Sequence, residues 1–295
     1  MGIYTSDKPV VTVVIPYYQH KLFVKSCIDS VAAQRYENIQ LVVIDDCSPD
    51  GSGAYVEELV ASQAYKDRFH GGVIFKQLQE NSGAHAAINH GIGLASGELI
   101  AIINSDDRYH RERLQRMVGE MLNQEAEFAF SRVGYIDADN AEITESHEVA
   151  ASFQEMQAKI AQFPTVGFSC LPWNSSLSTG NFVFSRRLYD QVGEFQSYRY
   201  CHDWDFLLRA LIYVEPLYID EALYYYRFHG KNTFESVKDL AVFESARILK
   251  NYFNMSKIRP CENPLAPSDV NWPHYFRLFL GLFNQSRLYE EARYL

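Results

Sequence analysis

Two pairs of adjacent carboxylates follow apolar runs in this sequence, and their side chains suit metal and phosphate chemistry. Asp45 and Asp46 follow one run, and Asp106 and Asp107 follow another. Carboxylate oxygens are the ligands that Mg²⁺ and Mn²⁺ prefer, so the second pair predicts an ion that bridges a diphosphate. The first pair could accept hydrogen bonds from a nucleobase. For both pairs the alternative is an acidic turn that caps the next helix.

A third acidic position and a cationic turn lie further along the chain. Asp203 follows His202 and precedes a helical pattern, so it is either a helix N-cap or a general base that faces a ligand. The segment Tyr224–Asn232 joins an aromatic, strand-like run to a turn that carries His229 and could close over phosphates. A single histidine in a turn is more often exposed or packed than a ligand, so both interpretations of His229 stay open.

The elements that must position these residues are alternating strands and helices in the first 122 residues. The predicted strands are Val10–Ile15, Leu41–Ile44, Val73–Leu78 and Leu99–Ile103, and the predicted helices are Phe23–Val31, Ala54–Tyr65, Ala84–Ala95 and Leu114–Leu122. Pro16 is expected to stop the first strand, because proline cannot donate to the ladder. Such alternation predicts a mainly parallel α/β sheet that binds ligands beyond the carboxyl ends of its strands.

The pattern becomes less regular after Asp137. Long loops are expected there, before a strand over Asn181–Phe184 and a helix that starts near Asp203. A further helix is predicted over Glu235–Phe253, followed by a proline-containing linker and an aromatic-rich segment from Tyr275. Because the chain ends within that segment, we expect the natural protein to be longer.

Composition excludes several classes of protein. The 295 residues carry a net charge of −10, which lacks the basic surface that nucleic-acid binding requires. The five cysteines are odd in number and widely spaced, which is typical of a reducing compartment. No apolar run approaches the roughly 20 residues of a membrane-spanning helix. We therefore expect a cytoplasmic protein with no signal peptide or transmembrane anchor, although peripheral contact with a membrane stays compatible with the sequence.

Taken together, these motifs resemble the family 2 glycosyltransferases, which have the GT-A nucleotide-sugar fold. The resemblance covers about Val10 to Asn232. It rests on the segments Val13–Gln19, Val42–Gly51, Glu80–Gly83, Ala87–Ile92, Ala95–Ile100, Asn104–Asp107, Thr179–Phe184, Val192–Phe195, His202–Asp203 and Tyr226–His229. It implies a GT-A domain over 1–234, with a nucleotide-binding half at about 1–107 and an acceptor half at about 108–234. A helical extension follows over 235–295.

The resemblance also implies a role for each site residue. Tyr18 stacks on the base, Asp46 accepts the pyrimidine N–H, and Asp203 is the catalytic base. Asp107 holds the Mn²⁺ or Mg²⁺ ion and the diphosphate, with Asp106 beside it on the donor and His229 as a further metal or diphosphate ligand. The remaining residues of the expected nucleotide-sugar site are Pro16, Asp45 and Asn89.

Three positions depart from the family pattern. Asn104 replaces the commonly acidic first residue of the metal motif, Ile88 stands where many members have arginine, and His202 replaces glutamate. Because Asp106 and Asp107 are retained, we expect metal binding to survive these changes better than the donor contacts do.

The function that follows is inverting, metal-dependent transfer of a sugar from a nucleotide-sugar, with UDP as the default nucleotide, to an acceptor hydroxyl of a glycan or glycoconjugate.

A dehydrogenase is disfavoured because Gly91-Ile92-Gly93 does not open a helix after a strand. A nucleotidyltransferase is disfavoured because no glycine-rich basic loop follows the first strand. The alternative from another class is a catalytically inactive nucleotide-sugar or partner-binding module of a larger protein. The donor sugar, the acceptor, the linkage and the oligomeric state are not determined by the sequence.

Overall fold

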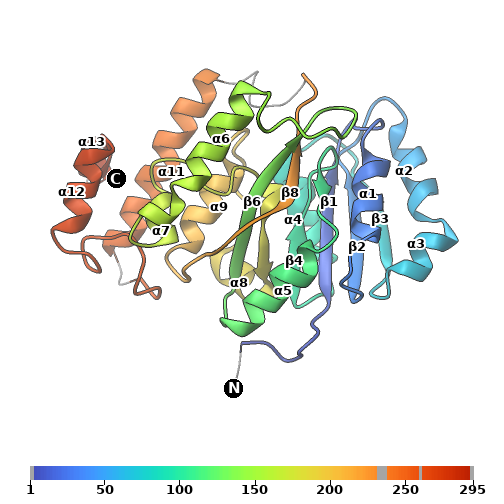
Figure 1. The fold of residues 1–295 in the computed structure, drawn as a ribbon, viewed down its shortest axis with the longest axis horizontal. Helices are drawn as coiled ribbons and strands as arrows, with labels where there is room; N and C mark the ends of the chain where they lie inside the picture. The colour runs from blue at the N-terminus through green and yellow to red at the C-terminus, as the bar shows by residue number, and fades with distance from the viewer. Residues whose placement is uncertain (1–2, 231–237, 259–260, 293–295) are drawn as a thin grey trace.

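The computed structural model describes residues 3–230, 238–258 and 261–292. An eight-stranded sheet in the order β3-β2-β1-β4-β7-β6-β8-β5 forms its centre (Figure 1). The strands are β1 Val11–Tyr17, β2 Ile39–Asp45, β3 Val73–Gln77, β4 Leu99–Ile102, β5 Arg108–Tyr109, β6 Phe128–Ile136, β7 Val183–Ser185 and β8 Leu217–Arg227. Strands β3, β2, β1 and β4 are mutually parallel, and β6 is parallel to β8. The predicted mixed, mainly parallel α/β architecture is confirmed.

Helices cover both faces of this sheet. They are α1 Val24–Ala32, α2 Ser52–Val60, α3 Gln63–Arg68, α4 Ala84–Gly93, α5 Arg113–Asn123, α6 Glu148–Ala158, α7 Val166–Ser169, α8 Arg186–Val192, α9 His202–Ala210, α11 Lys238–Ile258, α12 Tyr275–Leu282 and α13 Ser286–Glu291, with 3₁₀ turns η1 Ile160–Gln162 and η2 Thr179–Asn181. Alternate residues of β1 enter different cores, as the pleat of a strand requires. Val13 packs with α1 and α5, whereas Val14 packs with α4 and α9.

Strand β1 does not stop before Pro16, contrary to the prediction, and continues to Tyr17. The carbonyl of Val14 accepts from Ile103 on the β4 side, and the carbonyl of Tyr17 accepts from Asp46 on the β2 side. By this alternation Pro16 faces the β4 side, beyond Val14, the last residue of β1 in register with β4. Proline is tolerated there because it lies past the residues that are paired with β4.

Several elements differ from the sequence expectation. The single helix predicted over Ala54–Tyr65 is divided into α2 and α3. Strand β6 was not predicted, and the region expected to consist of long loops contains helix α6. The side chain of His147 caps α6 by accepting from the backbone N–H of Ala150. Histidine is not among the preferred N-cap residues, so the start of this helix gave no recognisable signal.

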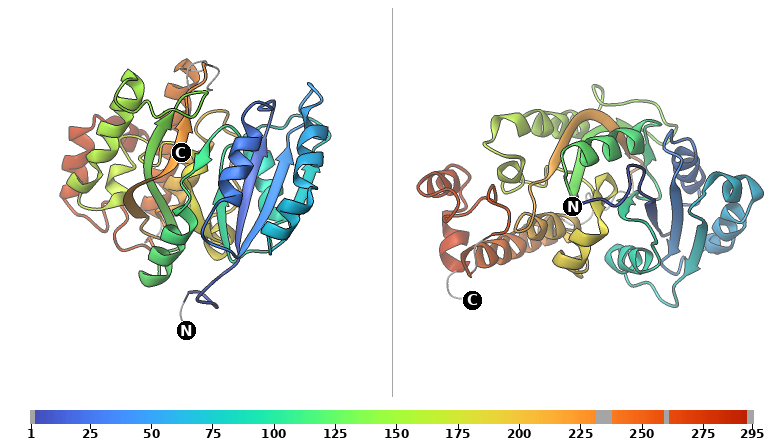
Figure 2. Two further views of the ribbon diagram at one scale, coloured as in Figure 1. Left: turned by 45° about the vertical axis from the view of Figure 1, so that its right-hand side comes forward. Right: turned by 90° about the horizontal axis from the view of Figure 1, so that it is seen from below.

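The C-terminal helices pack on one end of the molecule. Helix α11 contacts α9 and α13, and α12 contacts α13. Figure 2 shows α11, α12 and α13 on the side opposite to α1, α2 and α3. The sheet itself is continuous from β1 to β8, and the division at residue 234 remains a prediction. Residues 235–237 of the predicted helix and Tyr294–Leu295 lie outside the described residues. Among the helices that are described, none has both the length and the hydrophobicity to cross a bilayer.

Candidate functional site

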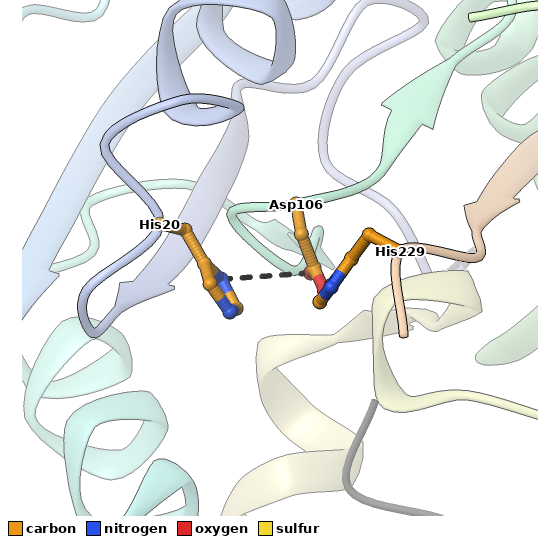
Figure 3. Close-up of side chains that lie close together, drawn as sticks. All are labelled: His20, Asp106 and His229. Carbon is orange, nitrogen blue, oxygen red and sulfur yellow. Dashed lines mark hydrogen bonds and ion pairs between the residues drawn. The ribbon is translucent and has the colours of Figure 1, made fainter. Parts of the chain in front are cut away.

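The acidic motif after β4 places Asp106, rather than Asp107, beside His229. His229 Nε2 lies 3.0 Å from Asp106 Oδ2, and His20 Nδ1 lies 3.8 Å from Asp106 Oδ1. Figure 3 shows the three side chains converging from the loop after β1, the loop after β4 and the end of β8. Burial raises the pKa of Asp106, but the two imidazoles outweigh it and hold this pKa below its ordinary value. A carboxylate between two imidazoles is a donor set that fits a divalent metal ion.

Asp107 is buried and is surrounded by protein hydrogen-bond donors. Its Oδ1 accepts from the backbone N–H of Arg227 at 2.7 Å, and its Oδ2 accepts from the hydroxyl of Tyr224 and from Asn104 Nδ2, the latter at 3.0 Å. Burial and the charge of Asp106 raise the pKa of Asp107 well above its usual range, against the opposing effect of these donors. In this geometry Asp107 links the end of β4 to β8. The metal role expected for Asp107 is better matched by Asp106.

Arg227 fixes this acidic motif to the loop after β6. Its Nε donates to the carbonyl of Asp106 at 2.5 Å, NH1 donates to the carbonyl of Asp137 at 2.7 Å, and NH2 donates to Asn140 Oδ1 at 2.9 Å. The guanidinium also lies over the ring of Phe23. Arg227 thereby fixes the end of β8, two residues before His229. Lys231 and Asn232 of the predicted closing turn lie outside the described residues.

The acids after β2 shape the loops around the expected nucleobase position. Asp45 accepts from Ser48 and from Gln77 Nε2, at 2.6 Å and 2.7 Å. Asp46 accepts the backbone N–H groups of Ser82 and Gly83, both at 2.8 Å. Asp45 is fully buried and Asp46 nearly so. Asp46 therefore organises the loop before α4, and its carboxylate retains further lone pairs for a base N–H.

Tyr18, Pro16 and Asn89 are placed differently. Tyr18 lies at the end of β1 with 37% of its surface exposed, so its ring is accessible to a base. Pro16 lies within β1. Asn89 Nδ2 donates to the carbonyl of Phe195, and its Oδ1 accepts from the N–H of Phe195, both at 2.9 Å. This pair of bonds ties α4 to the turn before α9 and engages both ends of the Asn89 amide.

Asp203 lies in the first turn of α9 and is held in a defined orientation. Its Oδ2 accepts from Asn174 Nδ2 at 2.9 Å, and its Oδ1 accepts from the N–H of Trp204 at 2.7 Å. Burial raises the pKa of Asp203, and the charge of His202 and these donors partly oppose the increase. A carboxylate with a raised pKa at a helix start is suited to accept a proton near neutral pH.

A short segment connects the metal motif to the helix that carries Asp203. Ser178 Oγ accepts from Asn104 Nδ2 at 2.9 Å, and Thr179 Oγ1 lies 3.0 Å from His202 Nε2. The next residue, Gly180, is closely packed, because a Cβ there would lie 2.2 Å from the Tyr224 hydroxyl oxygen. Asn104 and His202, two of the departures from the family pattern, thus contact consecutive residues.

The third departure, Ile88, is fully buried in the core with Val14 and Ile92.

Sequence reasoning missed His20, Asn174 and Tyr224 as members of the site. His20 and Asn174 lie in loops among other polar residues, and Tyr224 appeared only as part of an aromatic run. No local pattern marks them, since their partners are distant in the sequence.

Comparison with known proteins decides the family. A family model described as glycosyl transferase family 2 matches residues 12–193, more than half of the chain. The chain belongs to this family. Three relatives named as glycosyltransferases show how far this similarity extends in family 2.

The first of these relatives is TuaG of Bacillus subtilis, named for teichuronic acid biosynthesis. It is 29% identical over 127 residues, which cover 43% of this chain and 48% of TuaG. An uncharacterized glycosyltransferase of Rickettsia typhi is 26% identical over 76% of this chain and 66% of its own length. EpsH of Bacillus subtilis is 25% identical over 81% of this chain and 68% of EpsH. The chain therefore spans only part of the length of these relatives.

Solved structures show the same fold. The mannosyltransferase PcManGT of Pyrobaculum calidifontis, in complex with GDP-Man and Mn²⁺, has a TM-score of 0.64 at 15% identity, over 97% of this chain and 74% of PcManGT. Residues 1–349 of Staphylococcus aureus TarS, in complex with UDP, have a TM-score of 0.56 at 18% identity, over 96% of this chain and 91% of that one. The predicted GT-A-type fold of this family 2 chain is confirmed.

Proposed function

We propose that this chain transfers a sugar from a nucleotide-sugar to an acceptor hydroxyl, with inversion at the anomeric carbon and with Mn²⁺ or Mg²⁺ bound. The observation that carries the proposal is the Ser178–Thr179 bridge. It joins the motif Asn104–Asp107, whose Asp106 contacts His229, to the helix that holds Asp203. A metal-binding carboxylate and a separate base are thereby built into one connected network, as such a transfer requires.

In the proposed mechanism Asp203 accepts the proton of the acceptor hydroxyl. Its carboxylate is oriented by two donors, the side-chain amide of Asn174 and the N–H of Trp204. Tyr18 and Asp46 bind the nucleobase. Asp106 and His229 would hold the divalent ion, which would supply positive charge against the leaving diphosphate. Asp107 keeps this motif in register with β8.

The proposed donor is a UDP-sugar, and the proposed setting is cytoplasmic synthesis of a bacterial-type polysaccharide or glycoconjugate. The name of TuaG and the UDP complex of TarS support this choice. Cys27, Cys170 and Cys201 are buried thiols, which fits a reducing compartment. Burial raises the pKa of the Cys170 and Cys201 thiols to about 12, which keeps both unreactive.

The first experiment is calorimetric titration of UDP, dTDP and GDP into the purified chain, with Mn²⁺ and then with EDTA. We expect UDP to bind when Mn²⁺ is present and much less with EDTA, because Asp106 and His229 would hold the ion, whose positive charge would attract the diphosphate. Failure of all three nucleotides to bind with metal would contradict the proposal. Metal-dependent binding without hydrolysis or transfer of UDP-sugars would favour the inactive binding module instead.

A further inference from the structure

His20 is a histidine beside the proposed metal site to which the family motifs assign no role. It lies on the opposite side of Asp106 from His229, as Figure 3 shows. One nitrogen of each imidazole and one oxygen of Asp106 all lie within 4.8 Å of one another. Two atoms bound to one ion at about 2.0–2.2 Å stand about 3–4.4 Å apart. The three groups thus lie close to the separations that a shared ion requires.

The backbone around His20 is held in place before any ion binds. The carbonyl of His20 accepts from the N–H groups of Phe23 and Val24 at 2.9 Å, which fixes it at the start of α1. The N–H of Gln19 donates to Ser48 Oγ at 3.0 Å. Phe23 also stacks on the ring of His229, with ring centroids 5.0 Å apart. One turn of chain therefore positions both imidazoles.

We propose that His20 is the third protein ligand of the metal ion. This inference rests on the proposed function, in which Asp106 and His229 hold that ion. Two imidazoles and one carboxylate form a ligand set that favours Mn²⁺ and other transition metals over Mg²⁺, which prefers oxygen ligands and retains its water. The hydrogen bond between His20 Nδ1 and Ser105 Oγ, at 2.9 Å, orients the ring in the absence of metal.

The test is calorimetric titration of Mn²⁺ and Mg²⁺ into the wild-type chain and into His20→Ala, His20→Asn and Asp106→Asn. His90→Ala is the matched control, because His90 is exposed on α4. We expect both His20 variants to lose Mn²⁺ affinity by at least about tenfold, with little change for Mg²⁺ and none in the control. The absorption spectrum of bound Co²⁺ should change in the same variants, and circular dichroism checks that they fold.

The outcomes separate this inference from the proposed function. If Asp106→Asn abolishes Mn²⁺ binding while folded His20→Ala and His20→Asn bind Mn²⁺ as the wild type does, the His20 assignment is overturned and the metal site stands. If Asp106→Asn binds Mn²⁺ normally, the proposed metal site itself fails. Equal losses of Mn²⁺ and Mg²⁺ affinity in the His20 variants would overturn the proposed metal preference.

A second observation concerns Glu244, which lies on α11 and outside the part of the chain that matches the family model. Glu244 is 7% exposed, and its carboxylate accepts three consecutive backbone N–H groups. These are Arg199 at 3.0 Å and Tyr200 and Cys201 at 2.9 Å each. Cys201 is the N-cap of α9 and provides no side-chain cap of its own. An anion at this position fits both the donors and the helix dipole.

The geometry points to Glu244 as a positioning residue for Asp203, two residues beyond the N–H groups that it binds. Neighbouring residues of α11 support the same loop, since Ser245 Oγ lies 3.6 Å from Cys201 Sγ and Asn251 donates to the Tyr198 hydroxyl at 3.2 Å. Losing the carboxylate would leave the start of α9 without its acceptor. A small displacement of a base is enough to slow turnover strongly. This role also rests on the proposed function.

The test compares Glu244→Gln with Val242→Gln, an exposed position on the same helix. We expect Glu244→Gln to lower kcat by about ten- to hundredfold, with UDP affinity and donor KM unchanged, because the nucleotide site lies on other elements. Glu244→Asp should recover part of kcat. Unchanged kcat, or a parallel loss of UDP affinity, would overturn the positioning role. If Asp203→Asn keeps full turnover, the base assignment fails, whatever Glu244→Gln does.

Discussion

Replacing Asp203 with asparagine is expected to lower turnover by about 10²- to 10⁴-fold while UDP affinity in the presence of Mn²⁺ stays near that of the wild type. Asparagine keeps the shape of the side chain and its contact with the N–H of Trp204, but it cannot accept a proton. The measurement is kcat for transfer, together with calorimetric UDP binding. Asp190→Asn, on the exposed face of α8, is the control. Turnover near the wild-type rate would reduce Asp203 to a helix cap.

The rate of transfer is expected to depend on pH through the ionisation of Asp203, and the direction of this dependence follows from its raised pKa. Burial raises the pKa of Asp203, and the base acts only when ionised, so kcat/KM should rise with pH through a pKa above that of an ordinary carboxyl. Asn174 donates to the ionised form. Asn174→Ala should therefore move this acidic limb to still higher pH. If kcat/KM of Asn174→Ala rises over the same pH range as that of the wild type, another group controls the rate.

The second large effect is a difference between the adjacent acids, because replacing Asp106 and replacing Asp107 are expected to have different consequences. Asp106→Asn should remove metal-dependent UDP binding and leave the chain folded, because its carboxylate faces His20 and His229 rather than the core. Asp107→Asn should instead lower the free energy of unfolding by roughly 2–4 kcal/mol. Its new amide would place donors against the Tyr224 hydroxyl and the Asn104 amide, both of which donate to Asp107 in the native structure.

Urea denaturation and Mn²⁺-dependent UDP titration of both variants separate these roles. Glu120→Gln, on α5, where the carboxylate accepts from Gln124, serves as a control for loss of a carboxylate. A stable Asp107→Asn that fails to bind Mn²⁺ would restore the assignment expected from the sequence. An Asp106→Asn that binds UDP with Mn²⁺ as before would remove the ion from this position altogether.

The first half of the sheet was predictable because its strands carry their own signals. Strands β1, β2 and β4 are buried on both faces and therefore read as continuous apolar runs. Strand β6 was not predicted because Ser131 and Arg132 interrupt its apolar run. Its pairing with β8 is irregular at the same residues. A strand that bends at a bulge has no clean period, so local pattern cannot identify it.

The sequence by itself predicted that acidic residues follow two apolar strands, at the end of β2 and after β4, and that Asp203 lies at the start of a helix. Only the tertiary structure decided which acid of the second pair is engaged by protein donors. Asp106 and Asp107 are chemically alike, and Asp107 is engaged because Tyr224 and Arg227 arrive on β8. His20 and Glu244 likewise gain their roles from partners distant in the chain. Local sequence spacing determines the element on which a side chain lies. The partners of that side chain depend on which distant elements pack beside it.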